Sequence, residues 1–108
     1  MFDSVESFYH GFFLSLLYGV LGYEVRSNRE EGDGRTDIVL YPQQPKDKAI
    51  IFELKNRKKF IEMQDGIDEA FRQLREKRYE EGILDDGYIG SVSYGVCFCK
   101  KTCIIQKI

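Results

Sequence analysis

Two acidic residues and one lysine in the chain have types and spacing that suit phosphodiester chemistry: Asp37, Glu53 and Lys55. Side chains alternate between the two faces of a strand, so Glu53 and Lys55 point the same way if they lie on one strand. Two carboxylates with a backbone carbonyl offer the hard oxygen ligands that Mg²⁺ or Mn²⁺ prefers. A divalent ion at such a site polarises a phosphate, and a nearby lysine neutralises charge that develops on it.

The geometry of this site depends on how two predicted strands, at about Thr36–Tyr41 and Lys48–Lys55, pair with each other. In a hairpin, Asp37 lies opposite either Glu53 or the lysine that ends the second strand, and both registers bring the three groups together. A slip of one residue would turn Asp37 to the wrong face. The alternative is an exposed Glu53–Lys55 ion pair on an edge strand with Asp37 in a turn, because the pattern E-x-K is common in strands.

Hydrophobic periodicity predicts the elements that must position these groups. Their order is helix, three strands, helix, two strands, which indicates an α/β fold with a mixed sheet flanked by helices. The first predicted helix has a wide apolar face, so we expect it to be heavily buried. Ile50, Phe52 and Leu54 alternate with the charged residues of their strand and should form a core surface. The predicted helices cover about Ser4–Leu21 and Phe60–Glu81, and the other predicted strands cover about Tyr23–Arg29 and, with a break near Lys100, Val92–Ile108.

Length and charge limit the classes of protein that the chain can represent. Its 108 residues, 43% of them hydrophobic, suit one packed domain over residues 1–108. A net charge of -2 and a pI near 5.4 count against a stand-alone duplex-binding module. They count less against a metal-dependent enzyme, whose site is itself rich in carboxylates.

The cysteines and the apolar start of the chain indicate a cytoplasmic protein without a membrane segment. The chain has three cysteines, an odd number, and they lack the paired C-x2-C spacing of structural zinc sites: Cys97, Cys99 and Cys103. We therefore expect them to be small apolar strand residues. Polar residues interrupt the apolar segment at residues 1–21 and no basic region leads it, so we expect a helix rather than a signal sequence.

Longer phrases around these residues resemble a known nuclease superfamily. Gly34–Ile38 followed by Phe52–Lys55 is similar to the D…(D/E)-x-K signature of the PD-(D/E)xK nucleases. Glu6–Phe12 and Gly22–Val25 resemble one bacterial and archaeal family of that superfamily, whose nuclease-like domain commonly follows an AAA-ATPase-like domain. The resemblance spans nearly the whole chain. It implies a restriction-endonuclease-like core, of order αβββαββ here, and Mg²⁺ (or Mn²⁺) as the cofactor.

The same resemblance implies roles for individual residues. Asp37 and Glu53 would bind the metal, and Lys55 would assist catalysis. Glu6 would face the site from the first helix as a further metal ligand or water-holding group, although an acid in the first turn also favours the helix dipole. His10 follows one turn later, and we expect it to be a polar neighbour rather than a base.

The second predicted helix contributes one further site residue by the same resemblance. In related exonucleases a glutamine and a tyrosine spaced as Q-x-x-x-Y approach the site, which carries Gln73 over as a catalytic residue. Lys77 stands at the position of that tyrosine, and we expect Tyr79 to be a packing residue at the helix end. A group of basic residues could follow a phosphate backbone or form a solvated face: Arg57, Lys58, Lys59, Arg72, Arg75 and Arg78.

The leading hypothesis is a metal-dependent nuclease that hydrolyses phosphodiester bonds in nucleic acid, with DNA favoured over RNA. The alternative is a nonenzymatic nuclease-fold module that binds nucleic acid or a protein partner such as an AAA-type ATPase, which the short chain and acidic pI favour. A homodimer through the aromatic-rich region Tyr88–Phe98 could accompany either function, although that region could also be core.

Overall fold

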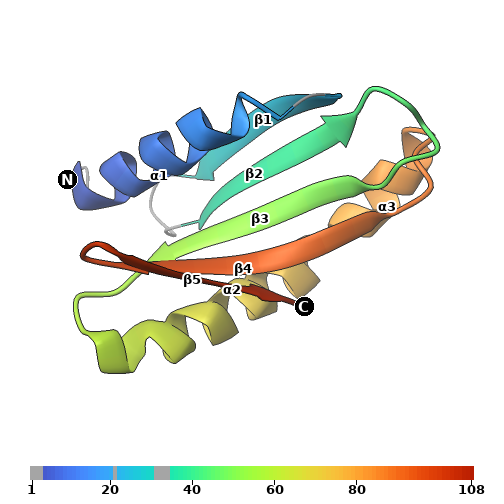
Figure 1. The fold of residues 1–108 in the computed structure, drawn as a ribbon. Helices are drawn as coiled ribbons and strands as arrows, with labels where there is room; N and C mark the ends of the chain where they lie inside the picture. Colours follow the sequence, from blue (N-terminus) through green and yellow to red (C-terminus); the bar gives the residue numbers. More distant parts are fainter. Residues whose placement is uncertain (1–3, 21, 31–34) are drawn as a thin grey trace.

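The computed structural model describes residues 4–20, 22–30 and 35–108, and the side chains of residues 8–20, 22–28 and 36–108. One helix and three strands are followed by two consecutive helices and two more strands (Figure 1). A short 3-10 turn, Phe60–Glu62, leads into the second helix. The elements are α1 (Ser4–Leu17), β1 (Tyr23–Glu30), β2 (Arg35–Pro42), β3 (Ala49–Asn56), α2 (Met63–Lys77), α3 (Tyr79–Asp85), β4 (Ser91–Cys99) and β5 (Thr102–Lys107).

The strands form one mixed sheet in the order β1-β2-β3-β4-β5. Neighbouring strands are antiparallel except β3 and β4, which are parallel. A parallel pair needs a long crossover connection, and α2 with α3 supplies it. The two long helices cover opposite faces of the sheet, α1 on one and α2 on the other (Figure 1). The predicted mixed sheet flanked by helices is confirmed.

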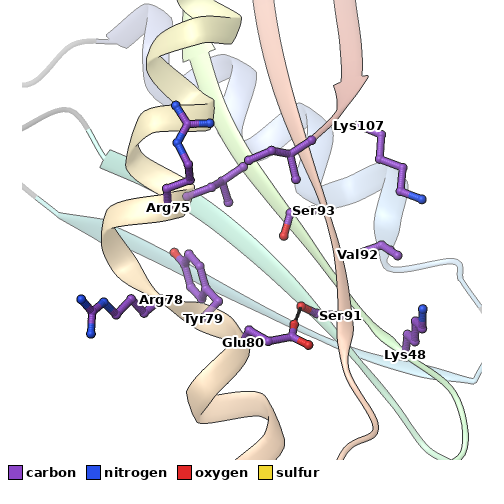
Figure 2. A pocket seen from close by; sticks show the side chains of 11 residues that line it. Lys48, Arg75, Arg78, Tyr79, Glu80, Ser91, Val92, Ser93 and Lys107 are labelled. Carbon is purple, nitrogen blue, oxygen red and sulfur yellow. Dashed lines mark hydrogen bonds between the residues drawn. The ribbon is translucent and has the colours of Figure 1, made fainter.

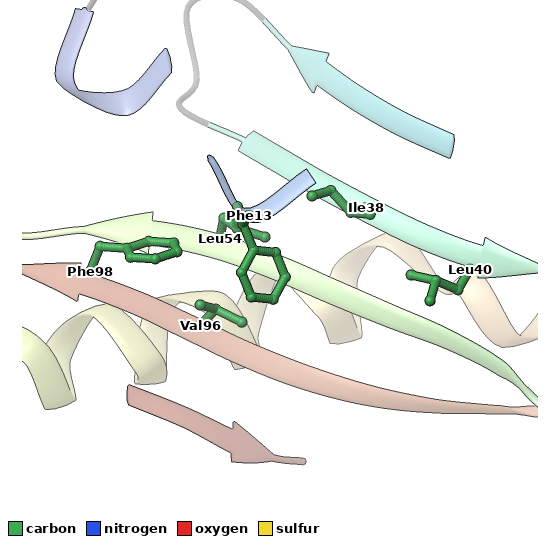
Figure 3. Packing of buried hydrophobic residues seen from close by; sticks show 6 residues of the cluster. All are labelled: Phe13, Ile38, Leu40, Leu54, Val96 and Phe98. Carbon is green, nitrogen blue, oxygen red and sulfur yellow. The ribbon is translucent and has the colours of Figure 1, made fainter. Parts of the chain in front are cut away.

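The face under α1 is held by a core cluster centred on Phe13. Its ring meets the rings of Phe52 and Phe98 edge-on, with centroids 5.1 and 6.0 Å apart. The even-numbered residues of β2 and β3 provide the floor of this cluster, as the alternation predicts; they include Ile38, Leu40 and Leu54 (Figure 3). Complete burial of such a side chain contributes roughly 1.5–3 kcal/mol, so this layer fixes which face β3 turns toward α1.

The expectation that α1 is heavily buried is wrong. Phe8, Phe12 and Leu16 are 65%, 51% and 59% exposed, because only the stripe that contains Phe13 reaches the sheet. The helix also ends at Leu17, four residues before the predicted end. None of the helices in the described ranges is long and apolar enough to cross a membrane.

The opposite face of the sheet packs against α2 and α3. Val39 and Ile51 meet Leu74 of α2 and Ile83 of α3 in one cluster. A second cluster, nearer the start of α2, joins Met63 and Ile67 with Cys97 and Cys99.

The cysteines divide between core and surface. All three lie in strands, as expected. Cys97 and Cys99 are buried, and burial raises the pKa of Cys97 to about 11, so its thiol stays protonated. Cys103 is exposed, because β5 is an edge strand that α2 barely covers.

Aromatic side chains of the region Tyr88–Phe98 pack within the chain. Tyr88 lies against Tyr41 with ring centroids 5.6 Å apart, and Tyr94 stacks on Phe52 at 5.5 Å. Their rings therefore contribute to packing between elements of the same chain.

The predicted continuous helix over Phe60–Glu81 is also wrong, because the chain breaks it at Arg78. This residue has φ 51° and ψ 48°, so it ends α2 and begins α3 in the left-handed conformation. A residue with a Cβ atom adopts that conformation at a cost of roughly 1–2 kcal/mol. Contacts made by the two flanking residues, described below, offset that cost.

The close packing of α2 on β4 predicts that residue 66 must be small. A Cβ atom on Gly66 would lie 2.5 Å from Sγ of buried Cys97. Overpacking costs about 1–3 kcal/mol, while helix propensity favours alanine over glycine by about 1 kcal/mol. We expect Gly66→Ala to lower the free energy of unfolding by up to about 2 kcal/mol, measured by urea denaturation.

A matched control is Gly82→Ala in α3, where a Cβ atom would meet nothing within 4 Å. That substitution should leave stability unchanged or raise it by up to about 1 kcal/mol. The penalty at residue 66 should shrink in a Cys97→Ala background. An equal penalty in both backgrounds would show that the thiol is not the obstacle.

Candidate active site

The three residues singled out by spacing lie together on the face of the sheet that α2 covers. Asp37 of β2 lies directly opposite Glu53 of β3, which is one of the two registers expected. Lys55 lies two residues farther along β3 and therefore on the same face. All three side chains are buried, with exposures of 1%, 0% and 7%. The structure therefore brings two carboxylates and one ammonium group together below α2.

Asp37 is held by side chains from two other parts of the fold. Asn28 of β1 donates a hydrogen bond of 3.1 Å to Oδ1. Nζ of Lys77 lies 3.0 Å from Oδ2, and the hydroxyl of Tyr79 donates to the same oxygen. The α2–α3 junction thus supplies two partners of one carboxylate oxygen.

Tyr79 corrects the sequence-based expectation, which made it a packing residue at a helix end. On a continuous helix Tyr79 would not share a face with Lys77, two residues away. The left-handed turn at Arg78 changes this relation, and both side chains reach Asp37. The sequence did carry a signal of this difference. Lys77 stands where the Q-x-x-x-Y spacing expects a tyrosine, so the tyrosine of the site had to come from another position.

Glu53 is the most deeply buried charged residue of the site. Its Oε2 accepts a hydrogen bond of 3.2 Å from the backbone N–H of Thr36 and lies 4.0 Å from Nζ of Lys55. Its Oε1 is buried and accepts no hydrogen bond from the described residues. Burial raises the pKa of Glu53 to about 7, the ammonium of Lys55 opposes this rise, and the nearby charge of Asp37 adds to it.

Gln73 is buried on α2, one turn before Lys77. It therefore lies on the side of the helix that faces the sheet. Its Oε1 is a second buried acceptor that no described residue satisfies. This placement is compatible with the role that the resemblance gave it.

The two residues proposed on α1 differ in what can be said of them. His10 borders a void of about 10 Å³ together with Thr36 and Lys55, at the end of β3. That volume is about enough for one water molecule. Glu6 falls within α1, but its side chain lies outside the part of the chain that the structure describes.

The basic run after β3 is partly engaged within the chain. The guanidinium group of Arg57 lies 3.1 Å from Asp65 and 2.7 Å from Glu69, so it ties the end of β3 to α2. Arg57 is thus less available for a phosphate backbone than its sequence position indicated. Lys58 and Lys59 are exposed.

The donor set fits a hard divalent cation in part. Within residues 8–20, 22–28 and 36–108, no group of three or more carboxylate, imidazole or thiol side chains is placed to hold a metal ion. Asp37 and Glu53 provide two such carboxylates in direct opposition, and Oε1 of Glu53 is a buried acceptor with no donor. Oxygen ligands of this kind, with peptide carbonyls and water, are the ligands that Mg²⁺ prefers.

Comparison with known proteins assigns the chain to a family. The sequence model of the PD-(D/E)XK nuclease superfamily matches residues 4–108, and the chain belongs to that superfamily. The mixed five-stranded sheet with flanking helices is accordingly a restriction-endonuclease-like α/β fold. Membership indicates a nuclease-type activity and binding of nucleic acid. No curated protein and no solved structure has significant similarity to the chain.

The raised pKa of Glu53 predicts a pH-dependent contribution to stability. Because the folded-state pKa is about 7 against an ordinary 4.5, the protonated form favours folding, and this contribution is lost as pH rises from 4.5 through 7. Glu53→Gln keeps the shape and cannot ionise. We expect the stability of the variant relative to the native chain to increase by on the order of 3 kcal/mol between pH 4 and pH 8.

Urea denaturation of both proteins across this range measures the effect. Glu62→Gln, which removes an exposed carboxylate just before α2, is the control and should show no such trend. A stability difference between native chain and Glu53→Gln that stays constant with pH would mean that Glu53 ionises as an ordinary carboxyl group.

Proposed function

We propose that the chain is a divalent-metal-dependent nuclease that hydrolyses phosphodiester bonds, with DNA as the favoured substrate. The observation that carries this proposal is the direct opposition of Asp37 and Glu53, with a buried oxygen of Glu53 that accepts no hydrogen bond from the described residues. Two buried carboxylates repel each other and are costly unless a cation shares them.

In this proposal some residues of the site bind the metal ion, and others stabilise the negative charge that develops on the phosphate or orient the water. Asp37 and Glu53, together with a peptide carbonyl of β3, would hold Mg²⁺ or Mn²⁺. When bound, the ion supplies Lewis-acid polarisation of the phosphodiester. Lys55, on the same face as Glu53, holds a positive charge where negative charge develops on the phosphate. Gln73 offers a buried carbonyl oxygen that can orient the attacking water.

Lys77 bears on metal binding, because its ammonium group contacts Oδ2 of Asp37, a carboxylate that would hold the divalent ion. At 3.0 Å from Oδ2, it already neutralises that carboxylate. We infer that Lys77 competes with the divalent ion and withdraws when the ion binds. Tyr79 can keep its hydrogen bond to Asp37, because a phenol is neutral and donates to a carboxylate whether or not a cation is present.

The contact between Lys77 and Asp37 also favours a second candidate function. If Lys77 stays on Asp37, the buried charges form a structural network and the chain is a nonenzymatic module. Such a module would bind nucleic acid or a protein partner, for example an AAA-type ATPase in a longer chain. Metal binding separates the two functions, because only the nuclease needs it.

The nuclease proposal predicts a strong dependence of cleavage on the opposed carboxylates. Purified protein should cut linear, plasmid or single-stranded DNA in Mg²⁺ or Mn²⁺ and should lose this activity in EDTA. Asp37→Asn and Glu53→Gln should each lower the cleavage rate by about 100-fold or more, because each removes a charge that acts at the reaction centre. Gel assays of product formation with time provide the measurement.

Glu62→Gln again serves as the control, since it removes a carboxylate outside the site without changing the fold. It should cut as well as the native chain. Cleavage by Glu53→Gln at the native rate, or no cleavage of any of these substrates by the native chain, would exclude the nuclease proposal.

The competition at Asp37 predicts that removing the charge of residue 77 strengthens metal binding. Even with the screening of bulk water, one charge about 4 Å from a divalent ion repels it by roughly 2 kcal/mol. We therefore expect Lys77→Met to lower the Kd for Mn²⁺ by at least about tenfold. Isothermal titration calorimetry gives this Kd without depending on cleavage.

Lys59→Met removes an exposed lysine before α2 and should leave the Kd unchanged. If Lys77→Met binds Mn²⁺ no more tightly than the native chain, Lys77 does not compete for Asp37. Failure of both proteins to bind Mn²⁺ would favour the nonenzymatic module.

A further inference from the structure

A second hollow in the surface lies beside the candidate active site, between the α2–α3 junction and the strands β4 and β5 (Figure 2). Its volume is about 450 Å³, within the range of sites that bind small ligands or parts of larger ones. Ser91 and Ser93 of β4 lie on its strand side. The basic residues that line this cavity come from four elements or their ends: Lys48, Arg75, Arg78 and Lys107.

Most of the basic residues around this cavity have no ion-pair partner in the part of the chain that the structure describes. Lys48, Arg75 and Lys107 make no ion pair with any residue in the described ranges, and Arg78 has only a surface pair of 3.8 Å with Glu81. Glu80 is the one side-chain carboxylate among the lining residues, and it accepts a hydrogen bond from Ser91. Four cations gathered around one cavity create a positive potential that favours an anionic ligand.

The cations are spread around the cavity. Arg75 and Arg78 come from the helical side, whereas Lys48 and Lys107 come from the strand side (Figure 2). A nucleic-acid strand, whose negative charges repeat along its length, matches such a spread arrangement better than a free phosphate does.

The cavity is joined to the candidate active site through three consecutive residues. Lys77 contacts Asp37, Arg78 lines the cavity, and Tyr79 does both, since its side chain lines the cavity and its hydroxyl reaches Asp37. Consecutive Cα atoms are about 3.8 Å apart. The cavity and Asp37 therefore share the α2–α3 junction, so a nucleic acid held at one of them lies close to the other.

We propose that this cavity binds the phosphodiester backbone of the nucleic acid next to the bond that is cut. The assignment rests on the proposed nuclease function for its position in the reaction, but the binding itself does not need cleavage. Arg75 and Lys107 are its main contacts, one from each side.

Fluorescence anisotropy of a labelled single-stranded oligothymidylate, measured in EDTA over a series of KCl concentrations, tests this proposal. The native chain is compared with the double variant Arg75→Glu, Lys107→Glu. The matched control is Lys46→Glu, Lys101→Glu, which changes the net charge equally. Lys46 lies in the exposed loop between β2 and β3, and Lys101 lies in the exposed turn between β4 and β5, both outside the cavity. Circular dichroism checks that all three proteins fold.

We expect the cavity variant to bind at least about tenfold more weakly at low salt, because two phosphate contacts are lost. The slope of log K against log salt is negative, and its magnitude should be smaller by about 1.4 in the cavity variant. Each phosphate contact of a single strand contributes about 0.7 to this magnitude. The control variant should bind within about twofold of the native chain, as expected for charges outside the contact surface. Equal weakening of both variants, or of neither, would overturn the proposal.

Two further measurements, competition by inorganic phosphate and DNA cleavage in Mg²⁺, distinguish a nucleic-acid site from a free-anion site and the backbone site from the nuclease function. If inorganic phosphate at low concentration displaces the oligonucleotide from the native chain but not from the cavity variant, the cavity is a free-anion site and the proposal is wrong. If the cavity variant alone binds weakly while the native chain cuts no DNA in Mg²⁺, the nuclease function fails and the backbone site stands. If the native chain cuts DNA and the cavity variant binds and cuts equally well, the nuclease function stands and the backbone site fails.

Discussion

Mutual repulsion between two buried carboxylates is the constraint on which the rest of this structure depends. The backbone pairing of β2 and β3 places Asp37 directly opposite Glu53, so neither side chain can avoid the other by a change of register. Several polar groups nearby reduce that repulsion. Lysines approach from β3 and α2, a phenol and an amide donate hydrogen bonds to Asp37, and Glu53 gains affinity for a proton. In this arrangement, protein groups balance the charges of the two carboxylates.

Much of this arrangement could be predicted from the sequence, because strand geometry is simple. Alternation of side chains along a strand placed Glu53 and Lys55 on one face, and the apolar residues between them identified the other face as core. The sequence restricted Asp37 to two partners but could not choose between them. That choice depends on how Ile38 and Leu40 pack beneath Phe13, which is a tertiary contact.

The partners of Asp37 on the helical side could not be predicted, for a physical reason. Neither glycine nor proline marks the end of α2, and the left-handed residue is Arg78, which has no intrinsic preference for that conformation. Its strain is tolerated where it lets Lys77 and Tyr79 satisfy one buried carboxylate. The exposure of Phe8, Phe12 and Leu16 was missed for a related reason, since periodicity counts apolar residues and does not measure how much sheet lies beneath them.

The connection between β2 and β3 lies at the end of the hairpin remote from the carboxylates. Three paired rows, Ile38 with Phe52, Val39 with Ile51 and Leu40 with Ile50, separate it from the Asp37–Glu53 pair. Residues 44–46 of this loop are exposed. A fluorophore, an affinity tag or a short insertion placed there should therefore leave the chemistry of the chain intact, which makes the loop a suitable handle for immobilising the protein or tracking it in single-molecule work.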